Sequence, residues 1–268
     1  MQKHLSSLQN PLVKQITALQ DKSRERRKQG LFIVEGKREI SLALQGGYSL
    51  IQMLYCPEIV SSESISGMLE SFSPSGEIIT VTQEVYQKFA YRSSTEGIIA
   101  LFKTKEHQLQ NLVFQGENPL ILVAEAPEKP GNIGALLRTA DAANLDAVII
   151  ANPKTDVYNP NIIRSSVGCV FTNSLATGTT SEIIEFLKAK KIAIFSAALQ
   201  ASIPYAQCNF QQATAIVVGT EAEGLSETWL QESTQNILIP MQGKIDSMNV
   251  SVAAGILIFE AKRQRNFQ

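Results

Sequence analysis

Three polar residues near the end of the chain have the types and the spacing of a ligand-binding loop. Asp246, Ser247 and Asn249 follow an apolar run at residues 237–239, which Pro240 stops, and they come directly before a helical pattern. Ser247 and Asn249 are both good helix N-caps, and backbone N–H groups at a helix start can hold an anion or a polar ligand. Alone, such a stretch is more often an ordinary capped helix, so a binding role depends on what the fold brings beside it.

Two stretches upstream supply an arginine and a carboxylate. Asn132 is predicted to cap a helix after the apolar run at residues 120–124, and Arg138 falls roughly opposite the buried stripe of that helix. Glu221 lies between two glycines after a second apolar run. Each has an ordinary explanation, a solvated arginine and a surface turn. Open α/β sheets nevertheless bind ligands where their strands end, and both residues follow predicted strands.

Several enzyme classes are excluded by what the chain lacks. The glycine-rich turn at residues 219–225 has neither the Gly-Lys-Ser/Thr of a nucleoside triphosphate site nor the G-x-G-x-x-G of a dinucleotide site. Only His4 and His107 could supply imidazole, one near the terminus and one in a polar stretch. The three cysteines stand far apart, without the close pairs of metal sites or disulfide frameworks. We therefore expect no metal and a reducing cytoplasm.

The hydrophobic pattern predicts two α/β domains. The chain has 268 residues, of which 44% are hydrophobic, with neither a secretion signal nor the ~18 apolar residues that would span a bilayer. Helix and strand patterns alternate in residues 1–103 and again in residues 118–268, and the polar residues 104–117 are predicted to be a linker. Strands that alternate with helices predict a parallel sheet covered on both faces. We expect a soluble cytoplasmic protein.

Two predicted helices of the second domain matter for the site. One runs through residues 162–170, and the last begins near Val250 and ends near Arg265. The last helix is apolar nearly all round, because Val252, Ile256 and Phe259 lie on the side opposite its first apolar stripe. A helix of this kind must be buried twice, by its own sheet and by a partner.

Positive charge is concentrated at the start of the chain, although the net charge is −1. Residues 1–30 carry an excess of five positive charges. Four of these cations stand close together: Arg24, Arg26, Arg27 and Lys28. Such a run is either a patch that contacts phosphates or a solvated helix face. The turn at residues 91–97 adds Tyr91, whose ring suits base stacking, although a plain loop is the more common explanation.

Three motifs in a fixed order resemble those of the SpoU (TrmH-type) branch of the SPOUT methyltransferases. They are Asn132-Ile133-Gly134 with Arg138-Thr139-Ala140, then Gly219-Thr220-Glu221 with Gly224-Leu225, then Ile239-Pro240-Met241 with Asp246-Ser247-Met248-Asn249-Val250-Ser251. Members of this branch are RNA ribose 2'-O-methyltransferases that use S-adenosylmethionine. The resemblance covers essentially the whole chain. Residues 1–103, with their segment 32–36 and Thr95-Glu96-Gly97, resemble the RNA substrate-binding domain, related to a ribosomal-protein (L30e-like) fold, that precedes many family catalytic domains.

The resemblance implies a fold and a set of site residues. Residues 118–268 would form a SPOUT methyltransferase domain with a parallel sheet and a deep trefoil knot. The residues that would contact S-adenosylmethionine are Gly219, Ile239 and Met248. The catalytic and RNA-facing set would be Asn132, Arg138, Glu221, Ser247 and Asn249. Arg138 would clamp a phosphate rather than act as a base, because a guanidinium hardly deprotonates in a protein.

Some residues depart from the family pattern. Thr220 stands where serine or asparagine is commoner, Met248 stands where leucine is commoner, and Glu223 adds a negative charge beside the RNA path. None of them removes a required group. The departures therefore bear on the identity of the substrate rather than on activity.

The first domain favours 23S-type ribosomal RNA as the acceptor, with transfer RNA as the alternative. Two other functions stay open. The first is a non-catalytic RNA-binding protein of ribosome assembly, which would transfer no methyl group to RNA. The second is a small-molecule methyltransferase or a nucleotide-binding enzyme, which would have no affinity for RNA and no role for the basic run at the start of the chain. Family members dimerise through the last helix, so the resemblance also implies a homodimer.

Overall fold

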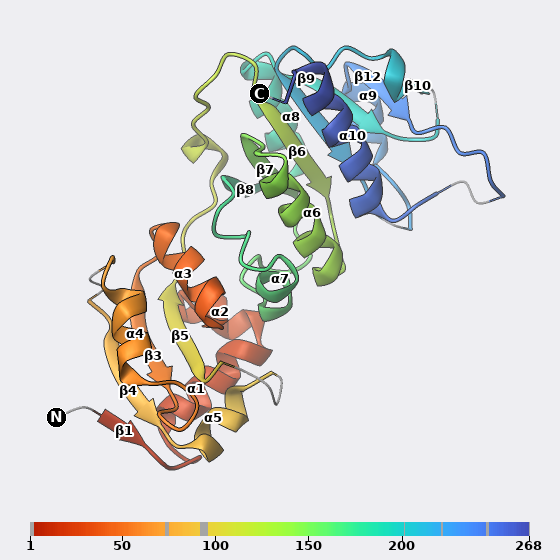
Figure 1. The fold of residues 1–268 in the computed structure, drawn as a ribbon. Coiled ribbons are helices and arrows are strands. Elements are labelled where there is room, and N and C mark those ends of the chain that lie inside the picture. Colours follow the sequence, from red (N-terminus) through yellow and green to blue (C-terminus); the bar gives the residue numbers. More distant parts are fainter. Residues whose placement is uncertain are drawn as a thin grey trace. The chain divides into compact units, whose positions relative to one another are not determined.

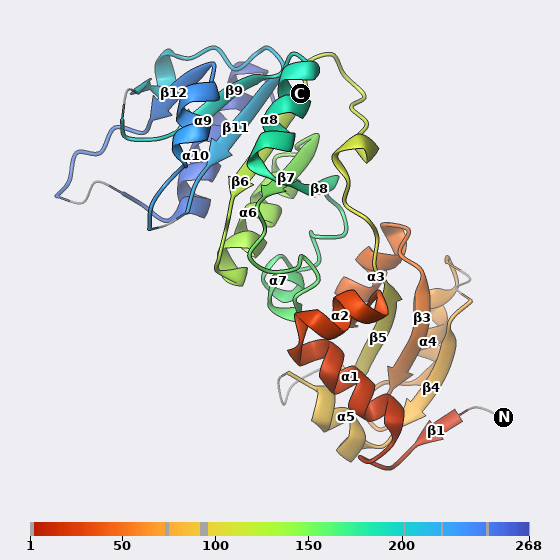
Figure 2. The same cartoon turned by 180° about the vertical axis from the view of Figure 1, so that it is seen from behind.

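The computed structural model describes residues 3–72, 75–91, 96–200, 202–220, 222–244 and 247–267. It divides the chain into two compact units, each drawn in Figures 1 and 2. One unit holds Met1–Glu106 and Asp156–Thr172, and the other holds His107–Thr155 and Asn173–Gln268. This division differs from the one expected at residues 104–117, because residues 156–172 belong to the first unit although they follow a strand of the second.

A mixed sheet forms the centre of the first unit. Its strand order is β1-β4-β3-β5-β2. The strands are β1 (Lys3–Leu5), β2 (Leu31–Glu35), β3 (Leu50–Tyr55), β4 (Glu77–Val81) and β5 (Ile98–Lys103). β1, β4 and β3 pair in parallel, whereas β5 runs antiparallel to β3 and β2.

Helices cover this sheet on both faces. They are α1 (Pro11–Asp21), α2 (Ser23–Gln29), α3 (Lys37–Gln45), α4 (Ser62–Leu69), α5 (Gln83–Phe89) and α7 (Pro160–Ser165). α3 and α4 are in front in Figure 1, and α1 is in front in Figure 2. Ile16 of α1 and Val85 of α5 are fully buried in one cluster with Ile33 and Leu101 of the sheet. Helical spacing of apolar residues thus places α1 and α5 on one face.

Aromatic rings attach residues 156–172 to the first unit. The ring of Tyr158 stacks on Phe32 of β2, with ring centroids 4.2 Å apart. Phe171 stacks on the same Phe32 and meets Tyr48 edge to face at 5.2 Å. The Tyr158 hydroxyl accepts a hydrogen bond from the Lys105 backbone N–H at 2.9 Å.

Arg26 is a buried charge that holds the same segment. Its side chain is 3% exposed, and Nε and Nη2 donate to the Asp156 carboxylate at 3.0 and 2.8 Å. Nη1 donates to the backbone oxygens of Leu19 and Gln20 at 2.6 and 3.0 Å. Arg26 is therefore not available to a phosphate, so the hypothesis of a phosphate-contacting patch keeps only its exposed neighbours, Arg24, Arg27 and Lys28.

The second unit contains the parallel sheet that the alternating pattern predicts. Its strand order is β10-β12-β9-β11-β6-β7-β8, and every neighbouring pair is parallel. The strands are β6 (Leu120–Glu125), β7 (Ala147–Ala151), β8 (Leu175–Gly178), β9 (Ala193–Ala197), β10 (Ile203–Pro204), β11 (Thr214–Val218) and β12 (Gln235–Leu238). The predicted α/β class with a parallel sheet is confirmed.

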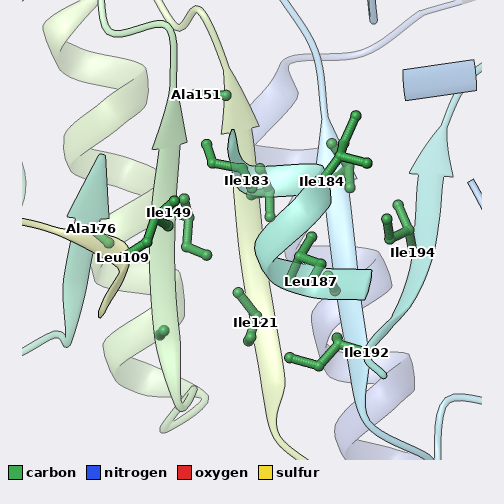
Figure 3. Packing of buried hydrophobic residues seen from close by; sticks show 14 of the residues in the cluster. Leu109, Ile121, Ile149, Ala151, Ala176, Ile183, Ile184, Leu187, Ile192 and Ile194 are labelled. Carbon is green, nitrogen blue, oxygen red and sulfur yellow. The ribbon is translucent and has the colours of Figure 1, made fainter. Parts of the chain in front are cut away.

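Helices cover this second sheet on both faces as well. They are α6 (Pro130–Ala142), α8 (Thr180–Ala189), α9 (Glu227–Glu232) and α10 (Val250–Gln264), with short 3-10 turns η1 (Leu109–Asn111) and η2 (Tyr205–Gln207). α6 and α10 lie together on one face, and α8 and α9 on the other (Figures 1 and 2). Figure 3 shows Ile183 and Leu187 of α8 packed over Ile121 and Ile149 of the sheet. Leu109, from the expected linker, is buried in the same core.

Three sequence predictions need correction. α6 begins at Pro130 with Lys129 as its N-cap, not at Asn132, because proline suits the first helical position, where no N–H is needed. α7 ends at Ser165, before the expected residue 170, because Val167 and Gly168 have φ of 54° and 83°. The short strands β1, β8 and β10 were not predicted. α10 begins after Asn249, whose side chain caps it, so that prediction is confirmed.

The buried Arg26–Asp156 pair gives a stability prediction. Asp156→Ala should lower the free energy of unfolding by about 3–5 kcal/mol, because it leaves a buried guanidinium without its carboxylate. Lys3→Ala is the control, because Lys3 and Glu77 form an exposed pair that contributes about 1 kcal/mol or less. Urea denaturation followed by circular dichroism measures both. Equal losses for the two variants would contradict the role of the buried pair.

Candidate active site

A cavity of about 390 Å³ lies at the edge of the second sheet where parallel strands end. Its walls come from the turns that follow β9, β11 and β12 and from the start of α10. Parallel strands all end at the same edge, so turns far apart in the sequence meet there. Most of the lining is apolar and includes Leu199, Val218, Leu225, Leu238 and Val250. Such a cavity suits a small ligand with a flat apolar part and a polar end.

The turn after β11 is closed tightly on itself. The Thr220 N–H donates to the Gly224 oxygen at 2.9 Å, and the Gly224 N–H donates to the Thr220 oxygen at 3.2 Å. A Cβ on Gly219 would lie 2.2 Å from the Gly224 carbonyl, far inside van der Waals contact. Gly219 is therefore required by close backbone approach, and the turn forms a preformed wall of the cavity.

The structure brings together the three residues predicted to contact a cofactor. Gly219, Ile239 and Met248 come from three segments of the chain, and all of them line the cavity. Ser247, predicted for the catalytic set, lines it as well. Because only Gly219 is required by sterics, side chains at the other positions can vary in shape.

Asn132 and Asn249, also from the predicted catalytic set, contact each other. Asn249 Nδ2 donates to Asn132 Oδ1 at 3.1 Å, which joins the N-cap of α10 to the first turn of α6. Asn249 Oδ1 also accepts from the Ser251 N–H at 2.9 Å. The amide pair therefore fixes the starts of two helices relative to each other.

Arg138 does not line the cavity. It is exposed on α6, six residues beyond Asn132, which corresponds to about 9 Å along the helix axis. The solvent-facing position predicted from helical spacing is confirmed. Two further residues of the motifs, Glu221 and Asp246, lie outside the described residues.

A buried carboxylate at the site was missed by the sequence interpretation. Glu125, the last residue of β6, is 5% exposed. Its carboxylate accepts hydrogen bonds from the Ser226 N–H and Oγ, both at 2.8 Å, and from Thr180 Oγ1 at 2.9 Å. The available signal was a charged residue that ends an apolar run. Its partners are 55 and 101 positions away, so no local pattern could name them.

The expectations about metal ions and membrane spans can be compared with the described residues. Within the part of the chain that is described, no group of three or more His, Cys, Asp or Glu side chains is arranged to hold a metal ion. None of the helices in those residues has the length and apolar character needed to cross a membrane.

Two protein-family models match the chain. Residues 119–259 match the model of the SpoU rRNA Methylase family. This range includes all three motifs and most of the second unit. Residues 10–100 match an MRM3-like substrate binding domain. The first match alone covers more than half of the chain.

Individual proteins resemble the chain over nearly its full length. A 23S rRNA guanosine 2'-O-methyltransferase of Bacillus subtilis is 27% identical and covers 97% of this chain and 99% of its own. The crystal structure of an RNA 2'-O ribose methyltransferase matches with a TM-score of 0.82 at 36% identity, covering 98% of this chain and 99% of that one. An AdoMet-bound rRNA methyltransferase from Sinorhizobium meliloti matches with a TM-score of 0.88 at 26% identity, covering 97% of both chains. Because a single family model matches residues 119–259, more than half of the chain, the chain belongs to the SpoU rRNA methylase family.

Proposed function

We propose that this protein transfers the methyl group of S-adenosylmethionine to a ribose 2'-hydroxyl in structured RNA, and that the RNA is a 23S-type ribosomal RNA. The observation that carries the proposal is the cavity built from three carboxyl-side turns, beside the Asn132–Asn249 contact and the helix that carries Arg138. Membership in a family of rRNA methylases supports it. The named activity of the Bacillus subtilis relative supports the choice of ribosomal over transfer RNA.

The residues of the cavity fit S-adenosylmethionine. A volume of about 390 Å³ lies in the range of small-ligand sites, about 300–1,000 Å³. Apolar walls suit an adenine ring, and among the described residues no atom outside the chain neighbours of Gly224 lies within 4 Å of the position that a Cβ there would occupy. Glu223 adds a carboxylate to a lining that would accept a positively charged sulfonium. Gly219, Ile239 and Met248 would hold this cofactor, which supplies an activated methyl group.

The polar residues beside the cavity position the acceptor. Arg138 clamps a phosphate next to the target ribose, since a guanidinium pairs with phosphate oxygens in a fixed fork and is not a base. Ser247 and Asn249 orient the ribose, and the Asn249 side chain is held by Asn132. Glu221, which was expected to hold Arg138, lies outside the described residues. Holding the 2'-oxygen in line with the methyl group is the main contribution of the protein to such a displacement.

The same proposal extends to the knot. Residues 118–268 form a SPOUT domain in which the chain passes through a loop and makes a deep trefoil knot. What supports it is the family to which the chain belongs; the chain crosses from β12 to α10, which packs on α6, as that fold requires. An experimental chain trace through residues 219–250 tests it.

Residues 1–103 bind the RNA in this proposal and have an L30e-like fold. The match to a substrate binding domain over residues 10–100 supports this role. Tyr91 is 61% exposed, with the Arg164 guanidinium 3.4 Å from its ring centroid. A ring backed by a guanidinium suits stacking on an RNA base. Together with Arg24, Arg27 and Lys28, it gives the first unit both base and phosphate contacts. Cytoplasmic RNA is consistent with Cys56, Cys169 and Cys208, all of them described residues, which form no disulfide.

The protein acts as a homodimer through α10. Val252 and Phe259 are 53% and 43% exposed and lie on one face of this helix. Exposed apolar residues seven positions apart form a stripe that a second copy of α10 can cover.

Arg138→Ala tests the catalytic assignment. It should leave the affinity for S-adenosylmethionine unchanged and reduce methyl transfer to ribosomal RNA at least about 100-fold, because the acceptor is no longer aligned. Calorimetry measures the affinity, and mapping of 2'-O-methyl sites on unmodified ribosomal RNA measures transfer. Lys190→Ala, which removes an exposed cation from the end of α8, is the control and should retain transfer.

Some outcomes would contradict that assignment. Equal loss of cofactor affinity and transfer in Arg138→Ala would mean that the arginine belongs to the cofactor site. Binding of RNA without binding of the cofactor by the wild type would favour the ribosome-assembly alternative. Methylation of transfer RNA alone would correct the acceptor.

Removal of two exposed cations tests the RNA surface. Arg24→Gln with Arg27→Gln should weaken RNA binding and lower the slope of log K against log salt by about 0.7–0.9 for each lost phosphate contact. Lys190→Gln with Lys191→Gln removes the same charge from the second unit and should leave that slope unchanged. Fluorescence titrations at several salt concentrations measure both. If the two double variants behave alike, the basic run is a solvated helix face.

A charged residue on the exposed face of α10 tests the dimer. Phe259→Glu should convert a dimer to a monomer, because two buried carboxylates would face each other across the interface. Light scattering after gel filtration measures the mass. Glu185→Ala, at an exposed position of α8, should leave the mass unchanged. A monomeric mass for the wild type would remove the dimer from the proposal.

A further inference from the structure

Glu125 is a buried residue that lies outside the three sequence motifs. It ends β6, and all three of its hydrogen-bond donors are neutral groups on other elements. Two of them belong to Ser226, the N-cap of α9, and one belongs to Thr180, the first residue of α8. A buried carboxylate is tolerated only when its hydrogen bonds are satisfied, so these donors must stay in place.

Ser226 connects Glu125 to the cavity. It follows Leu225, the last residue of the turn that forms one cavity wall. Two backbone hydrogen bonds between Thr220 and Gly224 close that turn on itself, and Gly219 abuts Gly224. The Thr220–Gly224 hydrogen bonds tie the two ends of the turn together, so holding Ser226 by two short hydrogen bonds fixes the orientation of Gly219, Thr220 and residues 222–225.

Glu125 also connects to the helix of the catalytic set. Ala126, the next residue, has φ of 43°, and its N–H donates to the Ala151 oxygen at 2.8 Å. α6 begins four residues further on and carries Asn132 and Arg138. The chain is thus held at the point where it turns from β6 toward α6. One carboxylate therefore ties the cavity wall to the strand that leads into α6.

We propose that Glu125 is a positioning residue for the cofactor site. Its carboxylate holds the turn at residues 219–225 against the end of β6, so that the cavity is preformed for S-adenosylmethionine. Glu125 itself is not a lining residue of the cavity, so it acts through Ser226. The inference rests on the proposed function, because it assumes that this cavity binds S-adenosylmethionine.

The Thr180 hydrogen bond separates positioning from ordinary stabilisation. Thr180 Oγ1 donates to the same carboxylate and also accepts from Asn152 Nδ2 at 2.9 Å. Its replacement therefore removes at least as much hydrogen bonding as the loss of the Ser226 hydroxyl. Thr180 belongs to α8, which contributes no residue to the cavity lining. A structural role alone would make Thr180→Val at least as harmful to cofactor binding as Ser226→Ala.

The experiment compares Glu125→Gln, Ser226→Ala and Thr180→Val in the full-length protein. Glu125→Gln should weaken S-adenosylmethionine binding about tenfold, because an amide has one acceptor oxygen in place of two and is uncharged, so the Ser226 N–H, the Ser226 hydroxyl and the Thr180 hydroxyl cannot all donate to it as they do to the carboxylate. Ser226→Ala should weaken it several-fold, and Thr180→Val less than about twofold despite a comparable fall in thermal stability. Calorimetry measures the dissociation constant, and thermal denaturation measures stability.

Two further readouts are specific to positioning. The KM for S-adenosylmethionine should rise in Glu125→Gln, while kcat at saturating cofactor stays within about twofold of the wild type. The double variant of Glu125→Gln with Ser226→Ala should bind no more weakly than Glu125→Gln alone, since both changes remove the same link.

Two results overturn the inference. One is unchanged cofactor binding in Glu125→Gln, or in Ser226→Ala if Glu125→Gln does not fold. The other is an equal loss of cofactor binding in Ser226→Ala and Thr180→Val. Absence of cofactor binding in the wild type is a different result, because it refutes the proposed function as well.

Discussion

The site depends on one constraint, that the strands of a parallel sheet all end at the same edge. β6, β9, β11 and β12 are neighbours or near neighbours in this sheet, so the turns that follow them converge although they are spread over more than a hundred residues. Within that group, the close approach of Gly219 to Gly224 gives the cavity a wall made of backbone. A wall made of backbone constrains few of the side chains around it.

Backbone construction also explains which substitutions the site accepts. Gly219 cannot carry a Cβ, whereas Met248 contributes an apolar surface that leucine would supply equally well. Thr220 makes two backbone hydrogen bonds, and its Oγ1 also accepts from the Glu223 N–H at 3.0 Å, a bond that a serine hydroxyl or an asparagine oxygen can make as well. The departures of Thr220 and Met248 from the family pattern therefore keep the groups that hold the turn and the apolar wall. The charge of the cavity does depend on side-chain identity, because Glu223 lines the cavity and adds a carboxylate to it.

Sequence reasoning succeeded where the cause of a structure is local. Helical spacing placed Arg138 on the solvent side of α6, and the cap at Asn249 followed from its residue type. It failed where the cause is a distant partner. In the sequence Arg26 is one more cation in a basic run, yet its side chain is buried in an ion pair with Asp156, 130 positions away. The hydrogen bonds of Glu125 are of the same kind, because the residues near Glu125 in the sequence do not indicate which distant groups donate to its carboxylate.

Residues 156–172 show why chain order is a poor guide to the units of this protein. They leave the second sheet after β7 and return to it at β8, yet Asp156, Tyr158 and Phe171 complete the interior of the first unit. Cutting the chain after residue 103 would leave the Arg26 guanidinium without its carboxylate and one side of the Phe32 ring uncovered. Both losses are large beside the small net stability of a domain. The first unit is therefore completed by a segment that lies, in the sequence, between two strands of the second unit, so no single cut separates the two units without loss of these contacts.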